Sequence, residues 1–266
     1  MKKLKIFSIC FFIAIVCFSF APSNTFVLAE EKPMLAIVID DFGQARGGVK
    51  EMLSVDCTLT CAVMPGLDFS VQDAENAFKK GHEVILHMPM EAYVKLPDSW
   101  YGPKVIRNYD TPERAKEVLK ECLAEIPHAV GVNIHIGSGV CLNKKLMTAI
   151  MEEVRDQGKY FLDSRTNEGS VCGEVAVATN TAFAERDFFL EVHGNANYDY
   201  AKKELLKSAK RALKQGVAIA IGHVGAEGGI STAQAIKDSI KEIEEMGVQI
   251  VPLSKVIKKL NSNYIV

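Results

Sequence analysis

The sequence predicts a single α/β domain built on a parallel β-sheet, and three observations support this prediction. The chain has 266 residues, which is enough for one (β/α) barrel. Aliphatic and aromatic residues make up 48% of the chain and charged residues 24%, so a large core can form and disorder is not expected. Short apolar runs alternate with longer amphipathic stretches, which is typical of parallel strands covered by helices on both faces.

Eight apolar runs are the predicted strands, and most of them end at an acidic residue, a histidine, a proline or a glycine. Seven or eight strand–helix units favour a barrel, and an open doubly wound sheet is the alternative. The runs occupy residues 34–39, 58–64, 83–86, 129–136, 159–162, 186–190, 217–221 and 248–251.

Four helices are predicted between these strands from their capping residues and from apolar residues that repeat at i, i+3 and i+4. Thr111 and Pro112 begin the first helix, and Asn143 caps the second. Gly158 ends the second helix, Gly216 ends a third at 198–215, and Gly247 ends a fourth at 231–246. The longest irregular segment is 88–110, and long ordered loops in compact domains are often functional.

Residues 1–29 form the pattern of a secretory signal peptide. Lys2, Lys3 and Lys5 precede an apolar run at 6–20, and cleavage is expected after Ala29, so that residues 30–266 form the mature domain. The apolar run is shorter than the ~20 residues of a spanning helix. An exported protein is therefore expected, and the alternative is an uncleaved signal that acts as a membrane anchor.

The charge pattern and the cysteines exclude other classes of protein. The formal net charge is −2 and the lysines at 202–214 have helical spacing, so a nucleic-acid partner is not expected. No pair of cysteines has the spacing of a CxxC zinc site. We expect the five cysteines that follow the signal to be buried as small apolar residues.

Polar residues that could carry chemistry lie at the carboxyl ends of five predicted strands. In parallel α/β folds these ends share one face, so residues far apart in the sequence are expected to converge there. Two histidines and an aspartate can bind a divalent metal, while a second carboxylate and a third histidine can act as base and acid in amide or ester hydrolysis. The residues are Asp40, Asp41, His87, His135, Asp163 and His223.

The remaining histidines differ in their position relative to that face. His82 precedes a predicted strand and His128 follows a predicted helix, so both are expected to be structural. His193 follows the sixth predicted strand on the correct face, which leaves a contact with substrate as an alternative to a structural role.

Several segments resemble the divergent polysaccharide deacetylase family, a branch of the polysaccharide deacetylase superfamily. The resemblance extends over about residues 34–254, and its specificity lies in the order and spacing of the segments. These are IDDFG at 39–43, GHE at 81–83, HMPME at 87–91, GVNIHIGS at 131–138, FLDSRT at 161–166, RDFFL at 186–190 and IGH at 221–223. The resemblance implies a single-domain, distorted (β/α) barrel of about seven parallel strands.

The resemblance also implies a divalent metal site, with Zn²⁺ as the expected ion. In the superfamily the first aspartate of the pair is the catalytic base and the second binds the metal, which assigns these roles to Asp40 and Asp41. The first metal histidine corresponds to His87. The second normally lies four residues later, where this chain has Glu91. The HIGS segment indicates His135 as the replacement, and Glu91 remains the competing ligand.

The expected activity is removal of acetyl groups from a glycan. His223 corresponds to the catalytic acid, and Arg165 is expected to orient the base because the usual Arg-Pro segment is missing. The alternatives are a barrel that binds cell-wall glycan fragments without turnover and a structural barrel with an incidental polar rim. The expected substrate contacts are Glu91, Ser138, Asp163 and Ser164.

Overall fold

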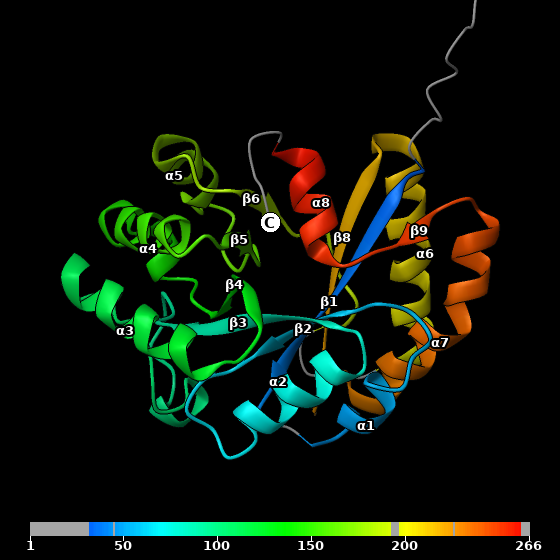
Figure 1. Cartoon of the computed structure of the whole chain (residues 1–266), viewed down its shortest axis with the longest axis horizontal. Coiled ribbons are helices and arrows are strands. Elements are labelled where there is room, and N and C mark those ends of the chain that lie inside the picture. The colour runs from blue at the N-terminus through cyan, green and yellow to red at the C-terminus, as the bar shows by residue number, and fades with distance from the viewer. Residues whose placement is uncertain (1–31, 45, 193–196, 226, 262–266) are drawn as a thin grey trace, which may run out of the picture. The chain divides into compact units, whose positions relative to one another are not determined.

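Parallel β-strands alternate with helices throughout the computed structural model, which describes residues 32–44, 46–192, 197–225 and 227–261 (Figure 1). The predicted signal peptide at 1–29 and His193 lie outside the described residues. None of the described helices is long and apolar enough to cross a bilayer.

The strands form one sheet, and each of its ladders is parallel. Two of the strands are only two residues long, and the short strand at 183–185 was not predicted from the sequence. The strands are β1 (Met34–Phe42), β2 (Thr60–Val63), β3 (Glu83–Met90), β4 (Ala129–Ile136), β5 (Tyr160–Asp163), β6 (Phe183–Glu185), β7 (Phe188–Phe189), β8 (Val217–His223) and β9 (Gln249–Ile250).

The strand order confirms the predicted distorted (β/α) barrel rather than a doubly wound sheet. The order is β6-β5-β4-β3-β2-β1-β8-β7, with β9 beside β1, so neighbours in the chain are mostly neighbours in the sheet. β6 and β7 stand at the two ends of this order, and the chain passes directly from one to the other. There the N–H of Arg186 donates to the oxygen of Asp163 on β5, and the N–H of Asp187 donates to the oxygen of Ile219 on β8.

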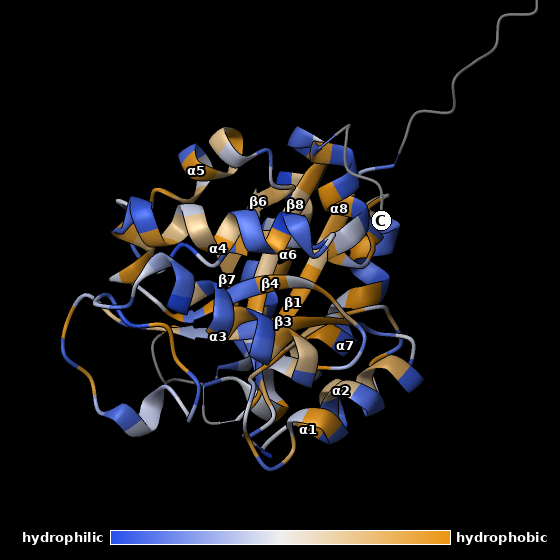
Figure 2. Ribbon diagram, turned by 60° about the vertical axis from the view of Figure 1, so that its left-hand side comes forward, coloured by the Kyte–Doolittle hydropathy of each residue, from blue (hydrophilic) through white to orange (hydrophobic). Residues whose placement is uncertain are grey.

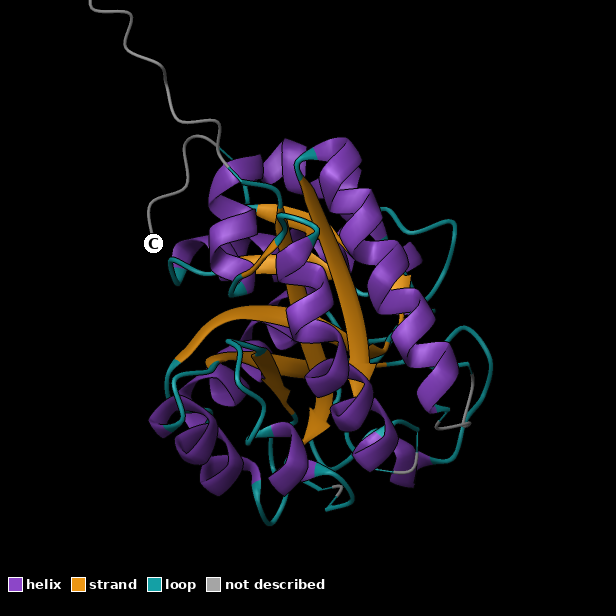
Figure 3. Ribbon diagram, turned by 90° about the vertical axis from the view of Figure 1, so that its right-hand side faces the viewer, coloured by secondary structure: helices purple, strands orange, loops and turns teal. Residues whose placement is uncertain are grey.

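Helices surround the strands, as Figure 3 shows. The four predicted helices are present at the predicted places. The helices are α1 (Val49–Met52), α2 (Ser70–Lys79), α3 (Pro112–Glu125), α4 (Lys144–Asp156), α5 (Cys172–Thr179), α6 (Tyr198–Gln215), α7 (Gly229–Glu245) and α8 (Leu253–Leu260), with short 3₁₀ turns η1 (Asp98–Trp100) and η2 (Val140–Leu142).

The predicted caps explain where these helices begin and end. The Thr111 hydroxyl accepts a hydrogen bond from the Arg114 N–H (3.2 Å), and the Asn143 side chain accepts one from the Leu146 N–H (3.3 Å). Both bonds satisfy an N–H group that has no partner within its helix. Gly216 ends α6 in the left-handed conformation (φ 85°), which glycine adopts without steric cost.

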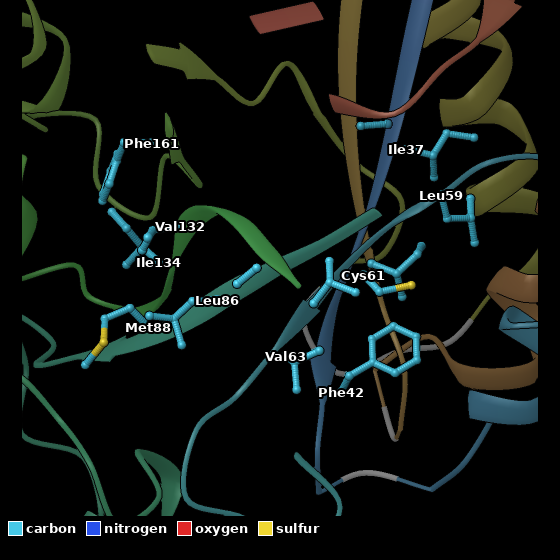
Figure 4. Close-up of a cluster of buried hydrophobic side chains, with 14 of the residues drawn as sticks. Ile37, Phe42, Leu59, Cys61, Val63, Leu86, Met88, Val132, Ile134 and Phe161 are labelled. Carbon is cyan, nitrogen blue, oxygen red and sulfur yellow. The ribbon is translucent and has the colours of Figure 1, made fainter. Parts of the chain in front are cut away.

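Side chains of the strands alternate between an outer layer under the helices and the barrel interior. Figure 4 shows part of the outer layer, to which β1 contributes Ile37, whereas Val38 faces the inner cluster. All five described cysteines are free, and four of them, including Cys61, are fully buried as predicted. In Figure 2 the strands are mainly orange, whereas helices such as α3 and α6 carry both colours, as expected for a sheet covered by amphipathic helices.

The inner series of side chains becomes polar at the carboxyl ends of the strands. Along β1, β3 and β8, the position two residues beyond an apolar inner residue carries Asp40, His87 and His223 respectively. At the amino ends, α8 packs against the inner cluster, and the Leu253 N–H donates to the Thr60 hydroxyl. The barrel is therefore filled with apolar side chains at one end and lined by ionisable groups at the other.

Candidate metal centre and active site

Asp40 and Asp41 both enter the site because β1 contains a bulge. Three residue steps separate Ile39 from Phe42, whereas their partners on β2 are two steps apart. Asp41 takes up the extra residue with a positive φ of 69°, a conformation that costs energy for a non-glycine residue. The strand therefore continues through Phe42, three residues beyond the strand predicted at 34–39.

Asp41, His87 and His135 bring three ligand atoms close together. Asp41 Oδ1 lies 3.3 Å from His87 Nε2 and 3.1 Å from His135 Nδ1, and these two nitrogens are 3.1 Å apart. Tetrahedral zinc with bonds of about 2.0–2.2 Å places its ligand atoms about 3.3–3.6 Å apart, which is close to the observed spacing. Asp41 Oδ1 is buried and accepts no well-directed hydrogen bond from the described residues.

The outer nitrogen of each histidine contacts an oxygen that accepts hydrogen bonds. His87 Nδ1 lies 2.7 Å from Asn133 Oδ1, and His135 Nε2 lies 3.0 Å from the main-chain oxygen of Trp100. Each outer nitrogen therefore carries the proton, and the lone pair of the inner nitrogen points toward Asp41. Three lone-pair atoms facing one another repel unless a cation lies between them, so the triad fits a divalent metal ion.

The charge state of Asp41 suits a metal ligand. Burial favours the neutral form of this carboxyl, but the charge and close approach of His135 and His87 in their protonated forms outweigh burial and hold its pKa well below the usual value. A divalent cation at the triad would supply the same positive charge in place of those protons. The carboxylate is therefore ionised at neutral pH. One carboxylate and two neutral imidazoles suit zinc and several other divalent ions.

Asn133 connects the metal triad to Asp40. Its amide N–H donates to Asp40 Oδ1 (2.8 Å), while its oxygen accepts from His87. Asp40 is only 2% exposed, and its Oδ2 lies 3.7 Å from His87 Nε2. Burial raises the pKa of Asp40 and outweighs the opposing charge that His87 carries when it is protonated. A carboxylate with a raised pKa next to a metal site has the properties of a general base.

His223 is held by a buried glutamate that follows β7. Its Nδ1 donates to Glu191 Oε2 (3.0 Å), and its main-chain N–H donates to Glu191 Oε1 (3.2 Å). The hydroxyl of Thr232 also donates to Oε1 (2.6 Å). Burial alone would lower the pKa of His223, but the hydrogen bond to Glu191 and nearby carboxylates raise it to about 10. His223 is therefore protonated at neutral pH, as an acid requires.

The triad and His223 open into one cleft of about 790 Å³. Its lining includes Leu96, Arg165, Arg186, Phe189 and Tyr200. The Arg186 guanidinium lies 3.5 Å from the centre of the Phe189 ring and donates to two main-chain oxygens after β5. The cleft thus combines charged groups with flat apolar surfaces.

Arg165 lines the cleft, but the predicted contact with the base Asp40 is not found among the described residues. Its guanidinium lies 3.7 Å from Glu185, and its own backbone is in the left-handed region (φ 53°). Among the described residues, Asn133 is the hydrogen-bond partner of Asp40. The structure therefore corrects the expectation that Arg165 orients the base.

Glu91 lies outside the metal triad. Its carboxylate accepts a hydrogen bond from the Asn108 N–H (2.8 Å) and lies 3.7 Å from the Arg107 guanidinium. Ser138 lines the cleft, and its hydroxyl accepts from the Tyr93 N–H (3.0 Å). The geometry thus supports His135 rather than Glu91 as the third ligand, and it places Ser138 in the lining of the cleft.

Asp163 and Ser164, predicted as substrate contacts, are not among the described residues that line the cleft. Asp163 accepts hydrogen bonds from the Arg165 N–H (2.7 Å) and the Ser170 hydroxyl (2.6 Å), and it is fully buried. Leu162 faces the interior, so alternation along β5 turns Asp163 outward. The Ser164 hydroxyl donates to a main-chain oxygen of β4. Both residues shape the loop after β5 instead.

His82 and His128 lie away from the cleft, in agreement with their predicted positions. His82 accepts the Leu59 N–H at Nδ1 and is buried. The ring of His128 stacks on Phe78, with 3.7 Å between the ring centres, and its Nε2 lies 3.1 Å from Glu75. Each histidine has a local partner that accounts for its position.

Three residues of the site were missed by the sequence analysis: Asn133, Glu191 and Arg186. Asn133 lies two residues before His135, and this spacing on one strand puts both side chains on the same face. That alternation was the available signal for Asn133. Glu191 directly follows the sixth predicted strand, at the predicted rim, so its position was also a signal.

The chain is similar to one uncharacterized protein in sequence and to another in structure. YibQ of Escherichia coli K12, an uncharacterized protein, is 29% identical over 201 residues, which cover 74% of this chain and 61% of that relative. The structure of the uncharacterized protein ATU2773 from Agrobacterium tumefaciens superimposes with a TM-score of 0.78 at 20% identity, over 86% of this chain and 90% of that one.

A second solved structure gives a weaker match. It is a mutant of BA3943 from Bacillus anthracis, described as a CE4 family pseudoenzyme with restored enzymatic activity. Its TM-score is 0.50 at 13% identity, over 85% of this chain and 68% of that one.

A family model for divergent polysaccharide deacetylases matches residues 37–257, from the first strand to the last helix. The chain belongs to the divergent polysaccharide deacetylase family.

Proposed function

We propose that this protein is a metal-dependent hydrolase that removes acetyl groups from N-acetylated or O-acetylated sugars of a polysaccharide. The observation that carries the proposal is the convergence of three ligand lone pairs, from Asp41, His87 and His135, beside a buried carboxylate and a protonated histidine. Zinc is the proposed ion because its preferred ligands and bond lengths match this set.

The residues of the chain divide the proton transfers between them. A divalent ion at the triad would polarise the acetyl carbonyl and acidify a water molecule. Asp40 takes the proton of the attacking water on its carboxylate. His223 uses Nδ1 to bind Glu191, which leaves Nε2 to deliver a proton to the leaving atom. An amine leaves poorly as an anion, so this acid matters more for an N-acetyl than for an O-acetyl group.

Acetate release tests the proposal directly. The zinc-loaded protein is incubated with a panel of acetylated glycans, and turnover by the wild type is compared with that of Asp40→Asn. We expect Asp40→Asn to lose ~10²–10⁴-fold in kcat while keeping its zinc, because the ligands are untouched. If the wild type binds the glycans but releases no acetate, the protein is a glycan-binding barrel without turnover. If Asp40→Asn retains full activity, the assignment of the base is wrong.

We also propose that the protein is exported, on the basis of the signal pattern at 1–29. N-terminal sequencing of the exported material is expected to begin at Glu30. A chain that still begins at Met1 and fractionates with the membrane would show that the signal is retained as an anchor.

A further inference from the structure

The segment 91–110, between β3 and α3, is tied closely to the metal site. The main-chain oxygen of Glu91 accepts hydrogen bonds from two N–H groups after β4 (both 3.1 Å). The Tyr93 N–H donates to Ser138 Oγ (3.0 Å), and the Ala92 N–H donates to the hydroxyl of buried Tyr101 (3.1 Å). These bonds, together with the contact between Trp100 and His135, fix the path of the segment.

This fixed segment nevertheless exposes large aromatic side chains. Four exposed aromatic residues are found in the described part of the chain, and three of them lie in this segment: Tyr93 (74% exposed), Trp100 (59%) and Tyr109 (81%). The fourth, Phe78, stacks on His128. Leaving an indole in water forgoes the stabilisation that burial would provide, and grouped exposed aromatic residues often mark a binding surface.

Among the exposed aromatic residues, Trp100 is the one whose backbone is hydrogen-bonded to a residue of the metal triad. Its main-chain oxygen accepts the hydrogen bond from His135 Nε2 (3.0 Å), so its backbone lies one hydrogen bond from a ligand imidazole. Leu96, in the same segment, lines the cleft. The segment therefore runs from the lining of the cleft, at Leu96, to Trp100, whose backbone contacts a metal ligand and whose side chain is exposed.

The size of the cleft also favours a substrate longer than one sugar. Its volume of about 790 Å³ is near the upper end of the ~300–1,000 Å³ found for small-molecule sites. Pyranose rings present a face of C–H groups, and such a face packs well against a flat aromatic ring. Trp100 is not among the described residues that line the cleft, but its backbone is one hydrogen bond from His135, so an indole exposed there can bind the sugar next to the one that carries the acetyl group.

We propose that Trp100 forms a second sugar-binding subsite, so that the protein prefers acetylated oligosaccharides over free acetylated amino sugars. The inference rests on the proposed function for its glycan ligand. Trp100 acts here through its indole, whereas its main-chain oxygen holds His135 whatever its side chain is. Substitution of the indole is therefore expected to weaken oligosaccharide binding without loss of zinc.

The test uses N-acetylglucosamine and its β-1,4-linked oligomers of two to five units. Trp100 is the only tryptophan of the chain, so intrinsic fluorescence of the zinc-loaded protein reports on this position alone. We expect the Trp100 emission to shift to shorter wavelength as the trimer is added, until the shift saturates. The dissociation constant is expected to be at least about tenfold lower for the trimer than for the monosaccharide. In calorimetry, Trp100→Ala is expected to bind the trimer about tenfold more weakly than the wild type does, and Trp100→Phe is expected to retain most of the affinity.

Tyr109→Ala is the matched control because Tyr109 is exposed in the same segment but lines a separate hollow with Pro103 and Arg114. This variant is expected to bind like the wild type. Equal affinity for monomer and trimer, or trimer binding unchanged in Trp100→Ala, would overturn the subsite. The subsite is also wrong if sedimentation shows that Trp100→Ala abolishes self-association instead of sugar binding.

Acetate release separates this inference from the proposed function. If the wild type releases acetate from the trimer and Trp100→Ala has the same KM, the subsite fails and the hydrolase stands. If the trimer binds in a Trp100-dependent way but no acetate is released, the hydrolase fails and the subsite stands. With both correct, Trp100→Ala raises KM for the trimer about tenfold, while the control Tyr109→Ala keeps the KM of the wild type.

Discussion

Replacing Glu191 with glutamine is expected to weaken the proton affinity of His223. Glutamine has nearly the same shape, so the hydrogen bonds from Thr232 and from the His223 main chain can still form. The negative charge that faces His223 Nδ1 at 3.0 Å is removed. The substitution therefore changes the electrostatics of the site more than its packing.

The magnitude follows from the pKa of His223, which lies at about 10 against an ordinary value of 6.5. At ~1.36 kcal/mol per unit, this rise represents roughly 5 kcal/mol in favour of the charged form. Burial opposes the rise, and Glu191 shares it with the carboxylates of Asp41 and Asp40. Hydrogen bonds to charged groups contribute about 1.5–3 kcal/mol, so Glu191→Gln should lower the pKa by about 1–2 units.

Two assays measure this change, and the first does not require catalysis. Because the folded pKa exceeds the unfolded one, protonation of His223 stabilises the fold fully below pH 6.5, and this stabilisation disappears as the pH rises through about 10. Urea unfolding of the metal-free proteins should therefore show that Glu191→Gln costs about 1.5–3 kcal/mol more at pH 6 than at pH ~10.5. In the zinc-loaded enzyme, the alkaline limb of kcat/KM should move down by about 1–2 pH units.

Glu227→Gln provides the control. Glu227 is 49% exposed and its carboxylate lies 3.9 Å from His223 Nδ1, so its loss should change stability by at most about 1 kcal/mol. If Glu191→Gln unfolds with the same pH dependence as the wild type and keeps the same alkaline limb, Glu191 does not set the charge of His223. The assignment of His223 as the catalytic acid would then lose its physical basis.

Metal content, ligand orientation and core packing supply three further tests. His135→Ala should lose full zinc occupancy in elemental analysis, whereas Glu91→Gln should keep it, and the reverse result would give the site to Glu91. Asn133→Ala should weaken zinc affinity about 10–100-fold in chelator competition, and unchanged affinity would refute its role in orienting an imidazole. Gly131→Ala should lower stability by about 1–3 kcal/mol, because the added Cβ would lie 2.3 Å from the Tyr160 ring, and an unchanged melting temperature would contradict this.

The convergence of the site could be predicted from the sequence because it depends only on chain direction. Parallel strands put their carboxyl ends on one rim, so Asp41, His87 and His135 could be grouped without knowing which strands pair. The same rule placed His82 at the opposite end. What the rule leaves open is which side chains on that rim touch each other.

The residues that were misplaced or missed depend on strand register and alternation. Asp163 lies at the rim, but its side chain faces away from the barrel interior because the preceding residue, Leu162, faces inward. Glu191 reaches His223 through the pairing of the two-residue strand β7 with β8, which local periodicity cannot reveal. The bulge at Asp41 is likewise a property of the β1–β2 pairing rather than of the local sequence.

The orientation of His135 depends on a main-chain oxygen in the segment 91–110, which makes this part of the site insensitive to residue type. Every amino acid at position 100 supplies the same acceptor, so no pattern of allowed residues there would reveal its role. A shorter segment, by contrast, would remove the acceptor even with all three ligands unchanged. Grafting Asp41, His87 and His135 onto another barrel would therefore transfer the ligands without the loop that aims them, and a working transplant must carry the segment as well.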